Sequence, residues 1–501
     1  MDQRMRALCD TAIPLIRDGG GRHEYDGMIQ DLSPGGVTSA LAALGGPAYD
    51  DPYDDALVAA KEAEARVVYG ELQMHRWNPY LHVQNLDLAG YDREYAPAAE
   101  RAAAKARHLA RWPDAVAAAL AALDQVSAPV AAATVDAARG LAAGLVRGRD
   151  AAQDAALDAQ ARLVAHLEAA AADGSPDAAL GGAALTRLLS AAEAIPVDLA
   201  ELAAQADSER DRLWALAEEA CGRIEPGRAP ADLLPELLRD HPDPDGVLTE
   251  SRALTEEVIA WTKEHELVPY HDGECRVGIT PESRQWAVAM MSWAAPGEPP
   301  GPSWYHVTPP KPDWPAAAQS EWLQLFSRTT LPAITVHEVA PGHFSHGVAL
   351  RHASSLPRQL ALSEAFIEGW AHYVEEVAVE EGFHADDPRF ALGVAVEALV
   401  RVTRLACAIG LHTGTMTVDD ATRRFEQDAF LAGPAARAEA RRGTFDPSYG
   451  RYTWGKLAIQ ALREQARSQW DTGFSLPRFH KALLDLGAPP LGLLGHALGA
   501  G

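Results

Sequence analysis

The feature that most constrains the fold is a helical periodicity that covers residues 55–220 of the 501-residue chain. This segment is rich in alanine and leucine, and its apolar residues recur every three to four positions, as in "DAAQDAALDAQARLVAHLEAAAADG" at 150–174. Such spacing is the period of amphipathic helices that pack against one another. Breakers at Pro129, 173–177 and 195–198 end the individual helices. We therefore expect several long helices.

The chain changes character near residue 240. After one more helical pattern at 255–267, the segments "CRVGIT" (275–280) and "SWYHVT" (303–308) have the composition of short strands. Helical patterns return over 319–340, 359–381, 388–412, 418–441, 452–469 and 476–486. The sequence thus predicts a mostly α fold with a few short β-strands near the middle of the chain. We expect an N-terminal helical region, 1–240, and a second helical region, 241–501, as parts of one integrated fold.

Composition narrows the classes of function. Seventy acidic against 44 basic residues give a formal charge of -26, which disfavours binding to nucleic acid and to anionic membrane surfaces. The sequence contains no run of about 18 uncharged apolar residues, so no membrane span is expected. The first twenty residues lack the apolar core of a secretory signal, and the four cysteines form no CxxC pair, so we expect a cytoplasmic location.

One stretch, "HEVAPGHFSH" at 337–346, resembles a zinc-binding HExxH motif with two residues inserted. His337 and His343 are six positions apart, which on a regular helix is about 600° of rotation and about 9 Å of rise. Two imidazoles so placed cannot share a metal. Pro341 removes a backbone donor and Gly342 tolerates unusual dihedral angles, so we expect the helix to be disrupted between Glu338 and His343.

A hydrolytic zinc site needs about three protein ligands and a general base. Downstream, "SEAFIEGWAHYVEE" (363–376) predicts a helix on which Glu364, Glu368 and His372 share one face. Glu368 is the first choice for the third ligand and Glu364 is its rival. His372 could orient a ligand from behind. In an alternative site, His346 would pair with His343 on an unbroken helix and His337 would not take part.

Several motifs together resemble a known family. They are "HEVAPGH", "EGWAHYVE", "RDHP" (239–242), "GITPE" (278–282), "GLHTGTMT" (410–417), "YTWGK" (452–456) and "RFHKALLDLGAPPLGLL" (478–494). In this order they are similar to the bacterial domain-of-unknown-function family 885, whose members are described as zinc metallopeptidases. The resemblance implies that His337, His343 and Glu368 bind Zn²⁺ and that Glu338 is the general base. It also implies a helical fold similar to that of the glutamate-zincins, with the active site in a deep cleft.

Amide hydrolysis also needs a donor to the oxygen that gains negative charge. Tyr452 is the first candidate and His412 the second; each could instead be a core residue whose polar group is satisfied. Lys456, in the same motif as Tyr452, is expected to be a solvated helix residue. The segment 303–308 could be an edge strand that holds an extended peptide, or a purely structural strand.

These observations predict a metal-dependent hydrolase, a zinc metallopeptidase that cleaves amide bonds with Glu338 as the base. The catalytic metal site is expected in the helical region 241–501. A second hypothesis is a specialised metalloenzyme acting on a small amide, an ester or a biosynthetic intermediate, because Ala408 stands where the family usually has an aspartate. A third is a helical binding protein without metal.

Overall fold

The computed structural model describes residues 1–501 except positions 286, 432 and 501. The protein is mostly α-helical, with one small sheet near the middle of the chain, as the sequence predicts. Helices of the first half are α1 (Gln3–Asp10), α2 (Ile13–Asp18), α3 (Pro34–Ala43), α4 (Pro52–Ala65), α5 (Pro79–Leu86), α6 (Ala98–Leu109), α7 (Trp112–Ala122), α8 (Ala128–Gly140), α9 (Ala151–Asp173), α10 (Gly182–Glu193), α11 (Leu199–Ile224), α12 (Pro230–Leu237) and α13 (Pro244–Glu264). Those of the second half are α14 (Ala316–Leu323), α15 (Leu331–Glu338), α16 (His343–His352), α17 (Leu356–Leu360), α18 (Glu364–Glu380), α19 (Pro388–His412), α20 (Val418–Asp428), α21 (Gly433–Phe445), α22 (Arg451–Trp470) and α23 (Leu476–Leu484).

Polar side chains fix where the helices begin. Asp150 accepts a hydrogen bond from the backbone of Gln153 at the start of α9, and Ser363 does the same for the first turn of α18. At α13, Asp243 caps the helix and is followed directly by Pro244, which needs no hydrogen-bond partner at that position. Local sequence therefore sets the boundaries of the elements that carry the candidate site.

Two of the expected helices are each divided. The segment 319–340 contains the end of α14 and the whole of α15, and Pro332 starts the second helix. The segment 418–441 is divided between α20 and α21 because Phe430 has a left-handed φ of 55°, and Pro434, which cannot donate a backbone hydrogen bond, follows Gly433 at the start of α21. Periodicity alone did not show these breaks, since the apolar pattern continues across them.

The sheet has the strand order β1-β3-β2. Strand β3 (Pro302–Val307) pairs in parallel with β1 (Glu274–Ile279) and antiparallel with β2 (Ala289–Ser292). Because β3 is hydrogen-bonded on both sides, the hypothesis that 303–308 is an edge strand for a peptide is wrong. The edges of the sheet are β1 and β2. Alternate residues of β3, including Tyr305 and Val307, are buried against α13 and α15.

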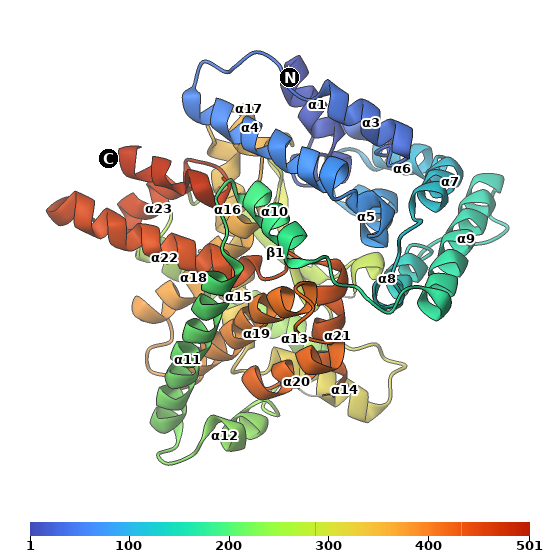
Figure 1. Ribbon diagram of the computed structural model, residues 1–501. Helices are drawn as coiled ribbons and strands as arrows, with labels where there is room; N and C mark the ends of the chain where they lie inside the picture. Colours follow the sequence, from blue (N-terminus) through green and yellow to red (C-terminus); the bar gives the residue numbers. More distant parts are fainter. Residues whose placement is uncertain (286, 432, 501) are drawn as a thin grey trace.

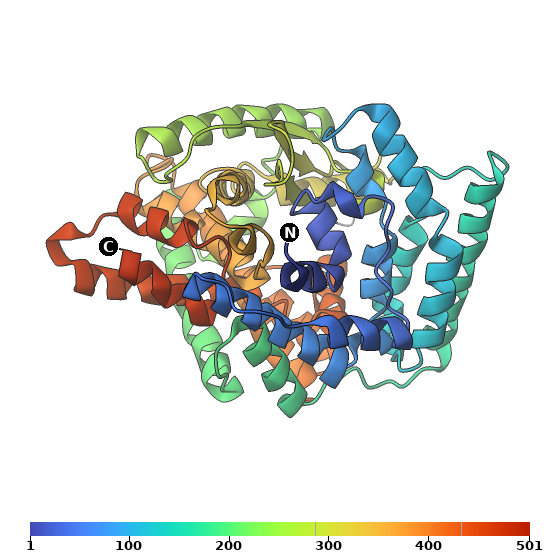
Figure 2. The same cartoon turned by 90° about the horizontal axis from the view of Figure 1, so that it is seen from above.

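Helices from both halves of the chain share the hydrophobic cores. Leu57 of α4 belongs to one cluster with Phe366 of α18 and Phe479 of α23, and Leu202 of α11 belongs to another with Leu399 of α19. The ribbon views show α6–α9 stacked at one end of the molecule and α22–α23 projecting at the other (Figures 1 and 2). The regions 1–240 and 241–501 are thus packed into each other rather than joined by a linker.

Helices α18 and α22 cross at a pair of glycines. A Cβ atom on Gly369 would lie 2.5 Å from the Cα atom of Gly455, so only glycine permits this close approach. Next to the crossing, Lys456 is fully buried and forms ion pairs with Glu209 of α11 and, at 2.7 Å, Glu376 of α18. Lys456 is therefore not the solvated residue that its helical pattern suggested. The crossing brings α22 beside the helix that carries Glu368.

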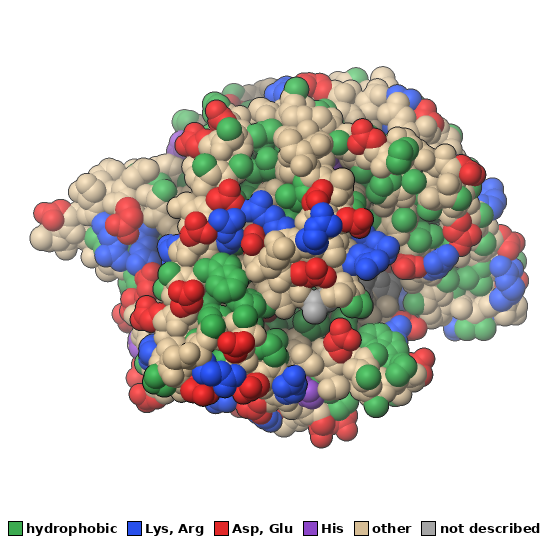
Figure 3. Space-filling model, turned by 60° about the horizontal axis from the view of Figure 1, so that its bottom comes forward, with side chains coloured by type: hydrophobic (Ala, Val, Ile, Leu, Met, Phe, Trp, Pro, Cys, Tyr) green, Lys and Arg blue, Asp and Glu red, His purple; other side chains and the backbone are tan. Residues whose placement is uncertain are grey.

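Charged side chains of both signs are mixed on the surface. On the face shown in Figure 3, Asp and Glu side chains lie among Lys and Arg side chains rather than in a separate field. Pairs such as Arg139 with Glu168, at 2.6 Å, are exposed and contribute little to stability individually. Within the described part of the chain, no helix combines the length and the apolar character needed to cross a membrane.

Candidate metal centre

The helix is interrupted where the spacing of the histidines requires it. Helix α15 ends at Glu338 and α16 begins at His343, so the two histidines occupy the facing ends of two separate helices. Between them the backbone leaves the helical region, with ψ of -91° at Val339 and -136° at Gly342, and the Ala340–Pro341 peptide bond is cis. The expected disruption between Glu338 and His343 is confirmed.

Glycine and tryptophan hold this interruption in place. A Cβ atom at position 342 would lie 1.9 Å from the carbonyl oxygen of His337 and 2.4 Å from that of Val336, so no side chain fits there. From α18, Trp370 donates a hydrogen bond through Nε1 to the carbonyl oxygen of Pro341 at 2.9 Å. The turn between the histidines is therefore fixed both internally and from the neighbouring helix.

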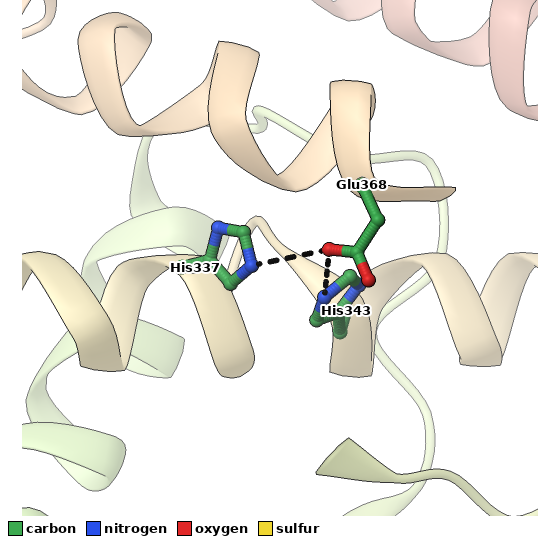
Figure 4. A group of neighbouring side chains, drawn as sticks. All are labelled: His337, His343 and Glu368. Carbon is green, nitrogen blue, oxygen red and sulfur yellow. Dashed lines mark ion pairs between the residues drawn. The ribbon is translucent and has the colours of Figure 1, made fainter. Parts of the chain in front are cut away.

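Three predicted ligands converge. Glu368 Oε2 lies 3.6 Å from His337 Nε2 and 3.4 Å from His343 Nε2 (Figure 4). The ligand atoms of the three residues all lie within 4.8 Å of one another. Zinc–nitrogen and zinc–oxygen bonds of about 2.0–2.1 Å in a tetrahedron place neighbouring ligand atoms about 3.4 Å apart. The spacing and the two-histidine, one-carboxylate donor set thus fit a zinc ion with one open position.

The ionisation of Glu368 suits a ligand. Burial alone would raise the pKa of this carboxyl, but hydrogen bonds from His337 and His343 hold the pKa well below its usual range. The carboxylate is therefore ionised at neutral pH, which is the form that binds a metal.

Glu375 and Arg401 form a second layer of side chains behind His337. The Nδ1 atom of His337 is 2.6 Å from Oε1 of Glu375, and Oε2 of Glu375 is 3.3 Å from Nη1 of Arg401. Glu375 is fully buried, which by itself would raise its pKa, but Arg401, His337 and His372 hold the pKa far below the ordinary value. A carboxylate that accepts the Nδ1 proton leaves Nε2 free to bind metal.

Sequence reasoning overlooked Glu375 and Arg401. Glu375 lies seven residues after Glu368, two helical turns along the same face, so the spacing that selected Glu368 also contained this signal. Arg401 lies on α19 and carries no local signal of its role.

Glu338 is buried next to the cluster. The residue is 7% exposed, and its Oε2 atom has no hydrogen-bond partner among the described residues. Burial raises the pKa of Glu338 above its usual value, although the charges of His343 and His337 oppose the shift. Glu338 adjoins His337 in the sequence, and an unpaired buried carboxylate oxygen with a raised pKa is suited to a general base.

The rival ligands lie elsewhere. The Glu364 side chain is 63% exposed and forms an ion pair with Arg451 at 3.0 Å. His346 is fully buried, with Nε2 placed 3.2 Å from the carbonyl oxygen of Gly487, and it does not belong to the cluster. His372 lies behind the cluster, with Nδ1 3.5 Å from Oε2 of Glu375, so it contacts the second layer and not the ligand atoms.

The two predicted oxyanion donors have different surroundings. The guanidinium carbon of Arg404 lies 5.0 Å from the centre of the Tyr452 ring. Burial, together with the negative charge of Glu368, raises the pKa of Tyr452. The phenol therefore stays protonated and can donate a hydrogen bond. It is close enough to the cluster for the charge of Glu368 to shift its pKa. His412 is almost fully buried, and its Nε2 and Nδ1 atoms pair with the carbonyl of Gly443 at 2.7 Å and the amide of Leu180 at 3.3 Å. Both ring nitrogens are used by the backbone, so the structure does not present His412 to a substrate.

Solved structures, but no curated proteins, are similar to this protein over almost its whole length. No curated protein matches the sequence. A solved structure from Shewanella oneidensis, described as a "putative lipoprotein of unknown function", has a TM-score of 0.78 at 19% identity, with 99% of this chain and 98% of that chain covered. A "putative lipoprotein" from Colwellia psychrerythraea has a TM-score of 0.77 at 17% identity, covering 99% and 97%. At these identities the likeness shows a shared fold.

The family model described as "Bacterial protein of unknown function (DUF885)" matches residues 52–498. This range contains the complete candidate metal centre and all the motifs that carried the resemblance. The protein belongs to this DUF885 family.

Proposed function

We propose that this protein is a zinc-dependent hydrolase that cleaves amide bonds, with a fold related to the glutamate-zincins. The observation that carries the proposal is the convergence of His337, His343 and Glu368 at 3.4 and 3.6 Å, beside the unpaired Oε2 of Glu338. A structural histidine cluster would not need a buried carboxylate oxygen left without a partner, because such a group costs about 1–3 kcal/mol or more.

When bound, zinc would supply a Lewis acid that polarises a carbonyl group and makes water more acidic. Glu338 then acts as the base. It takes a proton from the attacking water at a carboxylate oxygen and passes that proton to the nitrogen of the leaving amine. Its raised pKa makes Glu338 a stronger base than an exposed carboxylate.

Other side chains orient the ring of His337 and stabilise the negative charge that develops on the substrate oxygen. Glu375 fixes the ring of His337 and is itself held by Arg401. The phenol of Tyr452, which the raised pKa keeps protonated, is the donor for the oxygen that becomes negative as the carbonyl is attacked.

The test compares the wild-type protein with Glu338→Gln. Metal content is measured by elemental analysis, and hydrolysis is measured with a peptide library and with small acylated amines. We expect both proteins to hold one zinc per chain and the variant to lose about 10²–10⁴-fold in kcat. Glu256→Gln, which changes an exposed carboxylate on α13, is the matched control. Full activity in Glu338→Gln, or a wild-type protein that binds no metal, would overturn the proposal.

A further inference from the structure

A cavity of about 240 Å³ lies where the N-terminal helices meet the helices of the metal centre. Residues of α1, α2, α4, α10, α18 and α22 line it. Its apolar wall includes Leu8, Leu15, Ile16, Val68, Leu189 and Leu362. The volume is below the range of about 300–1,000 Å³ that is common for drug-sized ligands. It suits one amino-acid side chain.

The cavity begins one helical turn from the metal ligands. Glu364 and Ala365 line it, and Glu364 precedes the ligand Glu368 by four residues on α18. Residues at that spacing have Cβ atoms about 5–6 Å apart on the same face of a helix. On α22, the lining residues Arg451 and Trp454 are on either side of Tyr452 in the sequence. The cavity therefore lies next to the candidate metal centre along α18.

Both cations of the cavity wall already have partners. Lys61 pairs with Glu64, and Arg451 pairs with Glu364 at 3.0 Å and with Asp446. Among the side chains that line the cavity, Lys61 and Arg451 balance Glu64 and Glu364 in charge. The cations are the less accessible members, with side chains 17% (Lys61) and 14% (Arg451) exposed, so a ligand carboxylate would reach them less readily than a ligand ammonium group would reach Glu364. Glu364 is the carboxylate that the wall offers, since its side chain is 63% exposed.

Glu193 forms a further, deeper part of the wall. It is 5% exposed and accepts hydrogen bonds from the hydroxyl of Ser363 at 2.9 Å and the amide of Leu491 at 3.0 Å. Burial raises the pKa of Glu193 to about 8, so this carboxyl is largely neutral at pH 7. Glu193 therefore adds little negative charge to the wall.

We propose, on the basis of the hydrolase function proposed above, that the cavity receives the apolar side chain of the first residue of the substrate and that Glu364 binds its free α-ammonium group. The α-nitrogen is two bonds from the carbonyl carbon that is attacked, so both groups belong to the same residue. Glu364 lies one turn from Glu368, so an ammonium group bound by Glu364 and a carbonyl group at a metal held by Glu368 would be close enough to belong to one residue. The substrates are then short peptides or aminoacyl amides with a free amino terminus and an apolar first side chain.

Binding tests this inference without requiring turnover. Zinc-loaded Glu338→Gln protein is titrated calorimetrically with L-leucinamide, N-acetyl-L-leucinamide and glycinamide. We expect L-leucinamide to bind about tenfold or more tightly than either of the others, as a charge-assisted hydrogen bond and a buried side chain each predict. Adding Glu364→Gln should remove the preference over the acetylated compound, whereas adding Glu256→Gln should preserve it. Equal affinity for the free and acetylated amides would overturn the inference.

Filling the cavity is a second test. Ala12 lines the cavity at the start of α2, far from the ligands in sequence, and Ala12→Phe would occupy part of the space. We expect unchanged zinc content, with kcat/KM lowered about tenfold for leucyl substrates and nearly unchanged for glycyl substrates. An unchanged ratio of leucyl to glycyl activity would contradict the assignment of the cavity.

The inference and the proposed function can fail separately. If amino-terminally blocked peptides are cleaved as fast as free ones and this activity needs Glu338, the hydrolase stands and the amine-binding role of Glu364 is wrong. If L-leucinamide binds with the expected selectivity but no amide is cleaved by the wild-type protein, the ligand site stands and its link to hydrolysis is wrong.

Discussion

His337 Nδ1 lies 2.6 Å from Oε1 of Glu375, a carboxylate that sits two helical turns beyond Glu368 on the same helix. One helix thus supplies both the carboxylate that completes the candidate ligand set and the carboxylate that orients one of the other ligands. Arg401, 3.3 Å from the second oxygen of Glu375, compensates its buried charge. The candidate metal centre is therefore built on helices, and the partners that orient His337 are in place.

Replacing Glu375 should weaken metal binding while the ligands themselves remain. In Glu375→Gln a neutral amide replaces the carboxylate that accepts the Nδ1 proton of His337, so we expect zinc affinity to fall about 10–100-fold. Competition with a chromogenic chelator measures this. Glu381→Gln, an exposed carboxylate just after the same helix, is the control and should not change the affinity. Equal affinities in the two variants would show that Glu375 does not support the site.

Substitutions of His343 and His346, both on α16, should have sharply different effects. His343→Ala removes a ligand atom, and we expect the loss of zinc affinity to exceed the about 10–100-fold typical of an outer partner. His346→Ala removes a buried ring that pairs with the carbonyl of Gly487, so it should lower stability more than metal content. Elemental analysis and thermal unfolding of both variants measure the two effects. A larger metal loss in His346→Ala would transfer the ligand role to His346.

The turn between the histidines should tolerate only glycine at position 342. Gly342→Ala places a Cβ atom 1.9 Å from the carbonyl oxygen of His337, so the backbone must move, at a cost of about 3 kcal/mol in the free energy of unfolding. Zinc content should fall with it. As a control, Gly222→Ala in α11 meets no atom within 4 Å and should stabilise the protein by about 0.5–1 kcal/mol. Urea unfolding gives both values, and a Gly342→Ala protein as stable as wild type would show that the turn is not constrained in this way.

Stability should depend on pH through Glu193. Its pKa is raised from 4.5 to about 8 because the carboxyl is buried. Between these values the folded protein binds more protons than the unfolded chain, so the free energy of unfolding falls as the pH rises through this window. From about pH 6 to about pH 9, wild type should lose on the order of 2 kcal/mol more than Glu193→Gln. The pH dependence of urea midpoints tests this, and parallel curves for the two proteins would contradict it.

Much of the candidate site could be predicted from local sequence. Spacing and donor chemistry select His337, His343 and Glu368, and the structure brings these three together in preference to Glu364 and His346. The interruption of the helix followed from Pro341 and Gly342. Backbone chemistry of this kind acts within a few residues, so the sequence displays it directly.

Contacts between distant helices were not predictable in this way. Arg401 compensates Glu375 from another helix, and His412 is bound on both ring nitrogens by backbone groups of residues 180 and 443. Lys456 is buried among carboxylates from α11 and α18, although its own helix gives it the pattern of a surface residue. Each outcome depends on which element lies opposite, and no local pattern carries that information.

The sequence by itself determined the helical class, the position of the break between Glu338 and His343, and the three residues able to hold a metal. Tertiary packing decided that β3 is central rather than an edge and that Glu375 supports His337. It also decided that a cavity opens beside Glu364 at the junction of N-terminal and C-terminal helices. The physical reason is one of range: capping, helix breaking and ligand spacing act along a few residues of chain, whereas burial, charge compensation and cavities arise only where separate elements meet.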